Sequence, residues 1–323
     1  MKNILTYIEI KEGAPIKLSL EALSKASEIA VEKGNKSLAL ITEELKDDEL
    51  NKIKGAGASD IVLVKRDAYN MEDFSNIIVE VAKKYDCEDI FIPGTLDGKD
   101  LAPNVAATLD TVSLTNVMEI KFEGEEVLYV SPSYGATVLT ESKLNKAPRI
   151  ITVRAGSFDK REDLNGAGNL VEENIDEVKD IKSIIRDVVM AAGAEINLED
   201  APVIVTCGRG ASSDEIFPLV KELADAFGAP ISGTRPVIDD GVLPKASQIG
   251  QSGKIVSPAL YIGCGVSGAV QHISGMENSG FILAINKDED APIFNLADVG
   301  IVGDCKVILP LLIEEVKKIK ENA

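Results

Sequence analysis

The sequence of 323 residues has no tryptophan, few aromatic side chains and a single histidine, His272. Because aromatics make up only 4% of the chain, its cores must be built from Ile, Val, Leu and Ala, which suits parallel sheets covered by helices. No apolar run reaches the ~20 residues of a membrane span, and the N-terminus lacks a signal-peptide pattern. We therefore expect a cytoplasmic protein without a membrane span.

Basic residues are also scarce. The chain has 34 Lys and Arg against 53 Asp and Glu, which gives a formal net charge of −19. Such a surface repels nucleic acid and anionic membranes. We expect no nucleic-acid partner, and a partner protein with a basic patch fits this charge better.

Paired cysteines are missing from the sequence. The four cysteines, Cys87, Cys207, Cys264 and Cys305, form no C-x-x-C motif, which excludes the usual zinc and iron–sulfur spacings. Their wide separation indicates reduced, buried thiols of a cytosol-like compartment. We therefore expect no metal site.

What the chain does have is an alternation of short apolar runs with helical periods. The length favours about two domains, at roughly 150 residues each. In the first half, strands alternate with helices, which predicts a parallel α/β sheet. The expected strands are 4–10, 38–41, 61–64, 90–92 and 150–153, the expected helices are near 20–34, 47–54 and 72–84, and a polar turn at 121–126, with Glu123 and Gly124 at its tip, joins two further strands.

The second half repeats the α/β pattern after a charged segment at 156–187, which we interpret as a loop followed by an acidic strand or helix. We place the boundary near 185–200, which divides the chain into domains 1–190 and 191–323. Pro310 suits the first turn of a terminal helix. The predicted fold class is α/β, with two α/β domains of mainly parallel sheets, the second Rossmann-like. Its expected strands are 203–206, 230–232, 259–262, 282–286 and 300–302.

A glycine motif, Gly208-Arg-Gly210-Ala-Ser-Ser213, follows the first strand of the second domain. It is close to G-x-G-x-x-G, in which glycines allow the backbone to approach a phosphate at a helix N-terminus. An ordinary strand-to-helix turn explains the motif equally well. Arg209 adds a cation there, or is simply a solvated arginine.

A second glycine turn, Gly265-Val-Ser267-Gly268, follows another strand and opens a short helix that carries His272. Ser267 is expected to cap this helix, whose start would bind an anion. His272 would then place a side chain that titrates near neutral pH beside that anion. A lone histidine is more often a structural donor, but the glycine setting favours a ligand site.

Four further loops carry complementary donors, three of them at strand ends. Arg235 lies in the turn Gly233-Thr-Arg-Pro236, and the loop Gln248–Lys254 combines glycines with amide, hydroxyl and ammonium donors. Asn286 and Asp304 end two later strands, where an acid can bind a ribose hydroxyl. The alternatives are a surface salt bridge for Arg235, a plain glycine turn for the loop 248–254, and helix caps for Asn286 and Asp304. Because five loops follow five successive strands, one extended dinucleotide is the more economical explanation.

These motifs resemble the alpha subunit of electron transfer flavoprotein. The similarity is close over 201–323 and looser over the first ~190 residues. It is most specific between Tyr261 and Asn286, and it extends through Ala297-Asp-Val-Gly-Ile-Val-Gly-Asp304. Among mild departures, Gly263 stands where the family usually has alanine.

The resemblance implies a heterodimer with a beta subunit and an FAD held mainly by the C-terminal domain. It implies an electron carrier without catalytic residues, which shuttles electrons between an acyl-CoA or similar flavin dehydrogenase and another redox partner, in some relatives within an electron-bifurcating complex. Arg235 would lie against the isoalloxazine, Ser252 near its N5 and His272 near its O2. The implied FAD contacts are Arg209, Thr234, Arg235, Gln248, Ile249, Gly250, Gln251, Ser252, Ser267, Gly268, Ala269, Val270, Gln271, His272, Asn286, Asp304 and Cys305.

Two alternatives remain open. An NAD-dependent oxidoreductase subunit could use the same glycine loops, but it would need its own acid or base, and only His272 could easily serve. A structural nucleotide-binding subunit is the other alternative. Yellow bound flavin in the purified heterodimer would indicate the electron carrier, whereas a colourless nucleotide would indicate the structural subunit.

Overall fold

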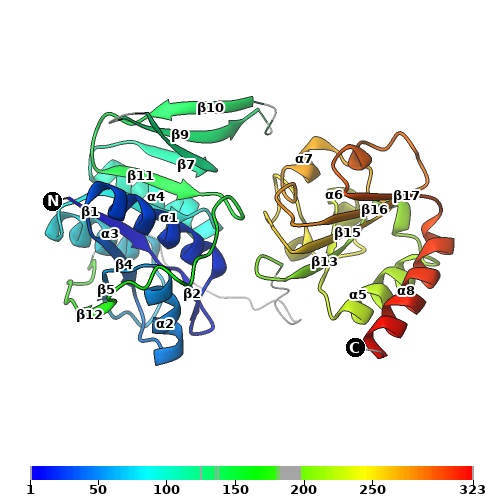
Figure 1. Ribbon diagram of the computed structural model, residues 1–323, viewed down its shortest axis with the longest axis horizontal. Coiled ribbons are helices and arrows are strands. Elements are labelled where there is room, and N and C mark those ends of the chain that lie inside the picture. The colour runs from blue at the N-terminus through cyan, green and yellow to red at the C-terminus, as the bar shows by residue number, and fades with distance from the viewer. Residues whose placement is uncertain are drawn as a thin grey trace. The chain divides into compact units, whose positions relative to one another are not determined.

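The computed structural model describes residues 2–123, 126–134, 136, 138–179, 181 and 198–321. The chain divides into two compact units, Met1–Val189 and Met190–Ala323, each built around its own parallel sheet (Figure 1). The predicted α/β class is confirmed. The domain boundary predicted at residue 190 lies outside the described residues.

The sheet of unit 1 is entirely parallel, as the alternation of strands and helices predicts. Its strands are fully buried in the centre, which explains their continuous apolar runs. The spatial order is β12 (Asn169–Glu172), β5 (Asp60–Leu63), β4 (Ser37–Ile41), β1 (Asn3–Tyr7), β6 (Cys87–Pro93), β11 (Arg149–Val153) and β7 (Ser113–Val117).

Helices cover both faces of this sheet because successive strand residues point to opposite sides. Leu5 and Tyr7 pack with one pair of helices, whereas Ile4 and Ile8 pack on the other face. The first helix ends at Gly34, which adopts the left-handed conformation with φ 67°, as predicted. The helices are α3 (Met71–Lys84) and α4 (Leu96–Thr108) on one face, and α1 (Lys17–Lys33) and α2 (Asp47–Gly55) on the other.

An antiparallel sheet accompanies the parallel one and is drawn at the top of unit 1 in Figure 1. It contains β8 (Glu119–Glu123), β9 (Glu126–Ser133) and β10 (Val138–Lys143). Glu123 pairs with Glu126, which confirms the predicted turn between strands, although its tip at Gly124 lies outside the described residues. The expected strand 4–10 is shorter than predicted: β1 ends at Tyr7, and β2 (Ile10–Lys11) pairs instead with β3 (Ala14–Pro15).

Unit 2 has a parallel sheet whose strands all overlap the predicted segments. One face packs against α5 (Phe217–Phe227) and α8 (Cys305–Glu321), which lie side by side in Figure 1. The opposite face is covered by loops and the short α7 (Val270–Ile273). The strand order is β14 (Ile231–Gly233), β13 (Val203–Cys207), β15 (Leu260–Cys264), β16 (Ile282–Asn286) and β17 (Val299–Val302).

Three expectations about helix starts in unit 2 are wrong. Pro310 is not in the first turn of α8, because Asp304 caps the helix earlier by accepting a hydrogen bond from the Lys306 amide at 2.8 Å. The first glycine motif does not open a helix: it forms the 3-10 turn η1 (Arg209–Ala211), and α5 begins only at Phe217. Ser267 does not cap α7, because Ala269 occupies the N-cap position and no side chain caps it.

Four short helices complete the described elements. They are α6 (Arg235–Asp239), which follows β14 directly, and the 3-10 turns η2 (Lys245–Ser247), η3 (Pro292–Asn295) and η1. Within the part of the chain that the structure describes, no helix is long and apolar enough to cross a membrane.

Candidate functional site

The candidate site lies at the carboxyl ends of the unit 2 strands. The chain runs from β13 to β14 on one side and then crosses to β15 on the other, so the strand order reverses between β13 and β15. Open α/β sheets bind ligands in the crevice at such a switch point. The two glycine turns singled out from the sequence follow these two strands, so the fold brings them together.

The two turns touch through their glycines. A Cβ on Gly208 would lie 2.1 Å from the carbonyl oxygen of Gly265, whereas a Cβ on Gly210 would lie 3.1 Å from the same atom. Gly265 has φ +64° and faces the amide of Ala211, where a Cβ would come within 2.7 Å. Gly208 also donates its N–H to the Cys264 carbonyl at 2.8 Å. The glycines are therefore required for the two turns to touch each other, and not only for the approach of a ligand.

The turn after β15 presents backbone donors. Among the described residues, no group accepts a hydrogen bond from the N–H of Ser267, Gly268 or Ala269. The turn is held from behind, because Asn286 donates from Nδ2 to the Val266 carbonyl at 2.8 Å and Ile293 donates to the Ser267 carbonyl at 3.1 Å. Successive free N–H groups of this kind bind phosphate oxygens. The helix dipole adds little, because α7 has only four residues.

Two arginines supply positive charge beside these turns. Arg209 is exposed, and no ion-pair partner for it occurs in the described parts of the chain. Arg235 begins α6, and its side chain is 72% exposed and lies 3.4 Å from Asp239. The surface salt bridge considered as the alternative for Arg235 is therefore present. An exposed pair of this kind is worth about 0–1 kcal/mol, so it leaves the guanidinium available to a ligand.

The glycine loop Gln248–Lys254 is docked against α7. Gly250 has φ +136°, and a Cβ there would lie 2.6 Å from the Gln271 carbonyl oxygen. Gln251 donates its N–H to that same oxygen at 2.7 Å. Gln248 is 1% exposed and donates to the Ser252 hydroxyl at 2.9 Å, so its amide stabilises the loop from inside. Gln251 and Ser252 themselves are exposed.

His272 is 6% exposed, and both of its ring nitrogens have protein partners. Nε2 lies 2.7 Å from the Tyr261 hydroxyl, and Nδ1 lies 3.1 Å from the Ile249 carbonyl oxygen. Burial lowers the pKa of His272 to about 4, against the opposing effect of the bond to Ile249. The expectation of a side chain that titrates near neutral pH is therefore wrong, because burial keeps the imidazole uncharged. Its contact with a ligand stays a prediction.

The remaining predicted residues lie at the same edge of the sheet. Thr234 is buried at the N-cap of α6, and Asn286 is 9% exposed and uses its amide to support the turn after β15. Asp304 caps α8, which was the alternative to a ribose contact. The Cys305 thiol is buried against the Ile285 carbonyl, so only its backbone could face a ligand.

Three polar residues beside His272 were not predicted as site residues from the sequence: Tyr261, Thr206 and Ser232. All three are fully buried within strands. The available signal was the presence of hydroxyl side chains in strands that are otherwise continuously apolar, because buried hydroxyls need hydrogen-bond partners.

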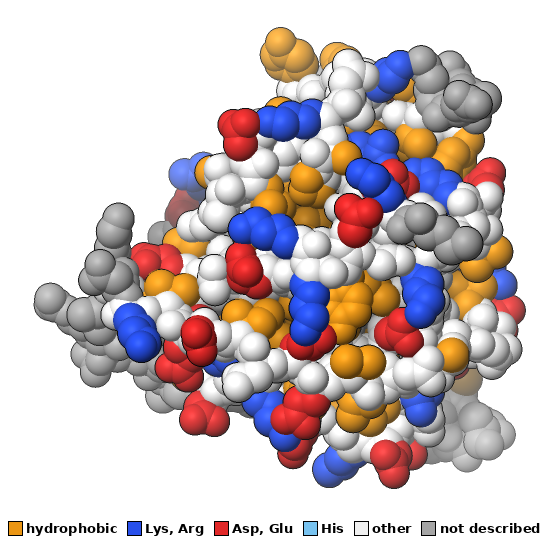
Figure 2. Space-filling view, turned by 90° about the vertical axis from the view of Figure 1, so that its left-hand side faces the viewer, with side chains coloured by type: hydrophobic (Ala, Val, Ile, Leu, Met, Phe, Trp, Pro, Cys, Tyr) orange, Lys and Arg blue, Asp and Glu red, His pale blue; other side chains and the backbone are white. Residues whose placement is uncertain are grey.

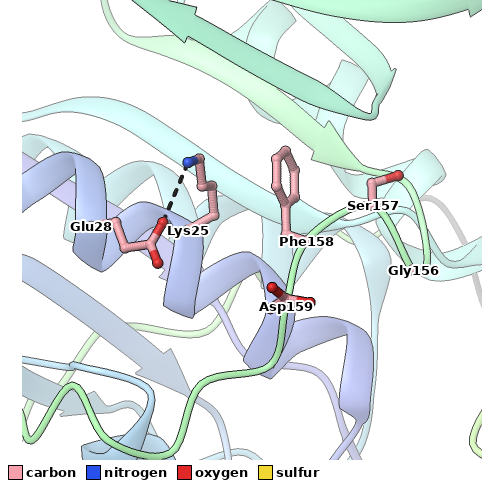
Figure 3. A pocket seen from close by; sticks show the side chains of 6 residues that line it. All are labelled: Lys25, Glu28, Gly156, Ser157, Phe158 and Asp159. Carbon is pink, nitrogen blue, oxygen red and sulfur yellow. Dashed lines mark hydrogen bonds and ion pairs between the residues drawn. The ribbon is translucent and has the colours of Figure 1, made fainter.

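A separate hollow of about 210 Å³ lies on unit 1. Figure 3 shows the Lys25–Glu28 ion pair, 3.3 Å long, on α1 and the Phe158 ring on the loop beside it. The six lining residues are all from unit 1, and none was predicted as a site residue.

Comparison with known proteins identifies the two parts of the chain. Residues 4–179 match the family model described as the electron transfer flavoprotein domain, and residues 197–277 match the electron transfer flavoprotein FAD-binding domain.

Similar proteins match this chain over almost their whole length. The alpha subunit of electron transfer flavoprotein from Thermoanaerobacterium thermosaccharolyticum is 37% identical, over 99% of this chain and 99% of that protein. The Bacillus subtilis alpha subunit is 34% identical over 98% of each, and the protein FixB of Clostridium saccharobutylicum is 34% identical over 98% of this chain and 97% of its own. The chain therefore belongs to the electron transfer flavoprotein alpha-subunit family, and its C-terminal domain is the FAD-binding domain of that family.

Proposed function

We propose that the chain pairs with a beta subunit and carries electrons through FAD, from an acyl-CoA or similar flavin dehydrogenase to a second redox partner in the cytoplasm. The observation that carries the proposal is the row of free N–H groups at Ser267–Ala269, at the switch point and beside the exposed Arg209. Amides and a guanidinium are the donors that a pyrophosphate needs. The donor set of the chain therefore fits FAD.

Bound FAD supplies the one- and two-electron chemistry, and the protein binds it, orients it and sets the charge around it. The backbone turn after β15 would hold the phosphates, and Asn286 and Asp304 would hold the adenosine half. Gln251 and Ser252, exposed on a loop fixed by Gly250, would face the flavin ring. No group is required to act as an acid or a nucleophile.

The charge of the chain supports a protein partner over nucleic acid. The net charge is −19, and the face drawn in Figure 2 carries Lys and Arg interspersed with Asp and Glu, without a basic patch. Hydrophobic side chains lie among these charges on the same face. Such a mixture is ordinary for the surface of a folded protein and offers no cluster of cations for a nucleic-acid backbone.

The decisive experiment is purification of the complex with its partner chain. We expect visible flavin absorbance and release of FAD on denaturation. One FAD per heterodimer would indicate a simple carrier, whereas two would indicate a second flavin in the beta subunit and electron bifurcation. A colourless complex that releases another nucleotide would overturn the proposal in favour of an NAD-dependent or structural subunit.

Arg235→Ala should lower the midpoint potential of the bound flavin. A cation beside the ring stabilises the added electron by on the order of 1 kcal/mol at an exposed position. The fold should be unaffected, because the ion pair that is lost among the described residues is the exposed one with Asp239. A redox titration measures the effect.

Lys317→Ala is the matched control for this change. It removes another exposed cation, paired with Glu222 at 2.7 Å, from α8. If the two variants titrate alike, Arg235 has no role at the ring.

A further inference from the structure

A buried chain of hydrogen bonds crosses the loop-covered face of the unit 2 sheet. The hydroxyls of Ser232 and Thr206 lie 2.7 Å apart on neighbouring strands in register. The Thr206 hydroxyl faces the Tyr261 hydroxyl, which lies 2.7 Å from Nε2 of His272. Nδ1 of His272 reaches the Ile249 carbonyl oxygen at 3.1 Å. The chain thus links β14, β13, β15 and α7 to the glycine loop.

The protons in this chain can be arranged in one direction. The Ile249 carbonyl can only accept, so Nδ1 of His272 carries the hydrogen. Tyr261 is the titratable side chain that contacts the imidazole among the described residues, and no charged group faces it, so the ring stays neutral and Nε2 accepts from Tyr261. The tyrosine hydroxyl then donates its proton to the imidazole, and the hydroxyls of Thr206 and Ser232 bond each other at 2.7 Å. Every buried group in the series is satisfied by this one arrangement.

Gly263 leaves room for the ring of Tyr261. It is the register partner of Thr206, and a Cβ there would lie 3.2 Å from Cε1 of Tyr261. The ring of Tyr261 therefore lies across the glycine, and its hydroxyl reaches Thr206 on one strand and His272 on α7. The alanine usual at this position would crowd the ring.

Building on the proposed flavin function, we propose that Tyr261 is a positioning residue of the flavin site. Its hydroxyl fixes His272 as the uncharged Nδ1–H tautomer, and His272 in turn clamps the glycine loop through Ile249. The loop residues Gln251 and Ser252 are thereby held for the ligand. The imidazole contributes a fixed dipole, and it neither gains nor loses a proton during electron transfer.

The single histidine allows a direct test. The full chain is produced with ¹⁵N-labelled histidine and studied by NMR in its purified complex with the unlabelled partner chain. We expect one protonated nitrogen, Nδ1, one unprotonated nitrogen, Nε2, and no titration at neutral pH. A protonated Nε2, or titration near the ordinary pKa of histidine, would overturn the proposal.

Tyr261→Phe removes the hydroxyl and keeps the ring. We expect the Nε2–H tautomer to become detectable, and the dissociation constant of FAD to rise on the order of tenfold, because a buried hydrogen bond is lost. An unchanged tautomer together with unchanged FAD affinity would refute the positioning role.

Two controls separate this role from a general loss of stability. Tyr129→Phe removes another buried tyrosine hydroxyl, 3.5 Å from Asp89 in unit 1, and should leave the histidine signals unchanged. Thr206→Val removes the hydroxyl that faces Tyr261. Tyr261 can still donate to His272, so the Nδ1–H tautomer should persist. If the purified complex lacked flavin but showed this tautomer, the proposed function would fail while the assignment of Tyr261 and His272 stood.

Discussion

Gly208→Ala should remove most of the FAD from the purified protein. The new Cβ would lie 2.1 Å from the carbonyl oxygen of Gly265, and 2.4 and 2.6 Å from two further backbone atoms of the neighbouring turn. Backbone cannot move aside as a flexible side chain can, so the turn after β15 must shift together with the N–H groups of Ser267–Ala269. Overpacking of this kind costs about 1–3 kcal/mol or more.

The conformation of Gly208 makes the result easy to interpret. Its φ of −89° is accessible to alanine, so backbone strain does not contribute. Gly210→Ala, in the same turn, places its Cβ 3.1 Å from the same oxygen and should retain flavin. The ratio of flavin absorbance to protein, with the melting temperature, measures both variants. Equal flavin loss in both would show that close contact at Gly208 is not the cause.

Asp89→Ala should destabilise unit 1 by about 3–5 kcal/mol, the usual effect of breaking a buried ion pair. Asp89 is 1% exposed and accepts two hydrogen bonds from Arg149, its register partner on the next strand, one of them at 2.9 Å. Lys33 lies 3.3 Å from the same carboxylate. Without Asp89, the largely buried Arg149 retains one ion-pair partner among the described residues, Glu88 at 3.5 Å.

Denaturation followed by tyrosine fluorescence measures this effect. The chain has no tryptophan, and five of its six tyrosines lie in unit 1, at positions 7, 69, 85, 129 and 134. Glu88→Ala, the neighbouring carboxylate with a side chain 21% exposed, should cost much less. Flavin fluorescence should report little change in unit 2. A loss under about 1 kcal/mol, the range of exposed pairs, would contradict the assignment of Asp89 as a buried anchor.

The buried strands of both parallel sheets could be predicted from the sequence, because they form apolar runs between helical periods. The partly exposed edge strand β7 was not predicted, and β12 falls in the segment interpreted as a loop followed by an acidic strand or helix. The segments 203–206 and 282–286 fall on β13 and β16 almost residue for residue. Helix starts were harder to predict. Pro310 suggested a helix start, but the Asp304 cap, which depends on where β17 ends, sets the start one turn earlier.

The site could be predicted as a set of loops but not as a set of side-chain directions. Glycines and donors after five strands place a ligand at one edge of the sheet. Whether a donor in those loops points outward depends on contacts between segments far apart in sequence. Gln248 turns into its own loop, and His272 turns toward Tyr261. The sequence signals for the second contact are the Tyr261 hydroxyl in an otherwise apolar strand and Gly263, the mild departure from the family pattern.

The reciprocal contacts between turns limit how this domain can be altered by design or in evolution. Gly208 faces Gly265, Gly250 faces Gln271 and Gly275, and Gly268 faces Ile293. In each pair, the backbone of one segment occupies the space where a side chain on the facing glycine would lie. A loop taken alone from a relative would therefore meet a mismatched neighbour, and the smallest exchangeable piece in a chimera is a pair of facing turns.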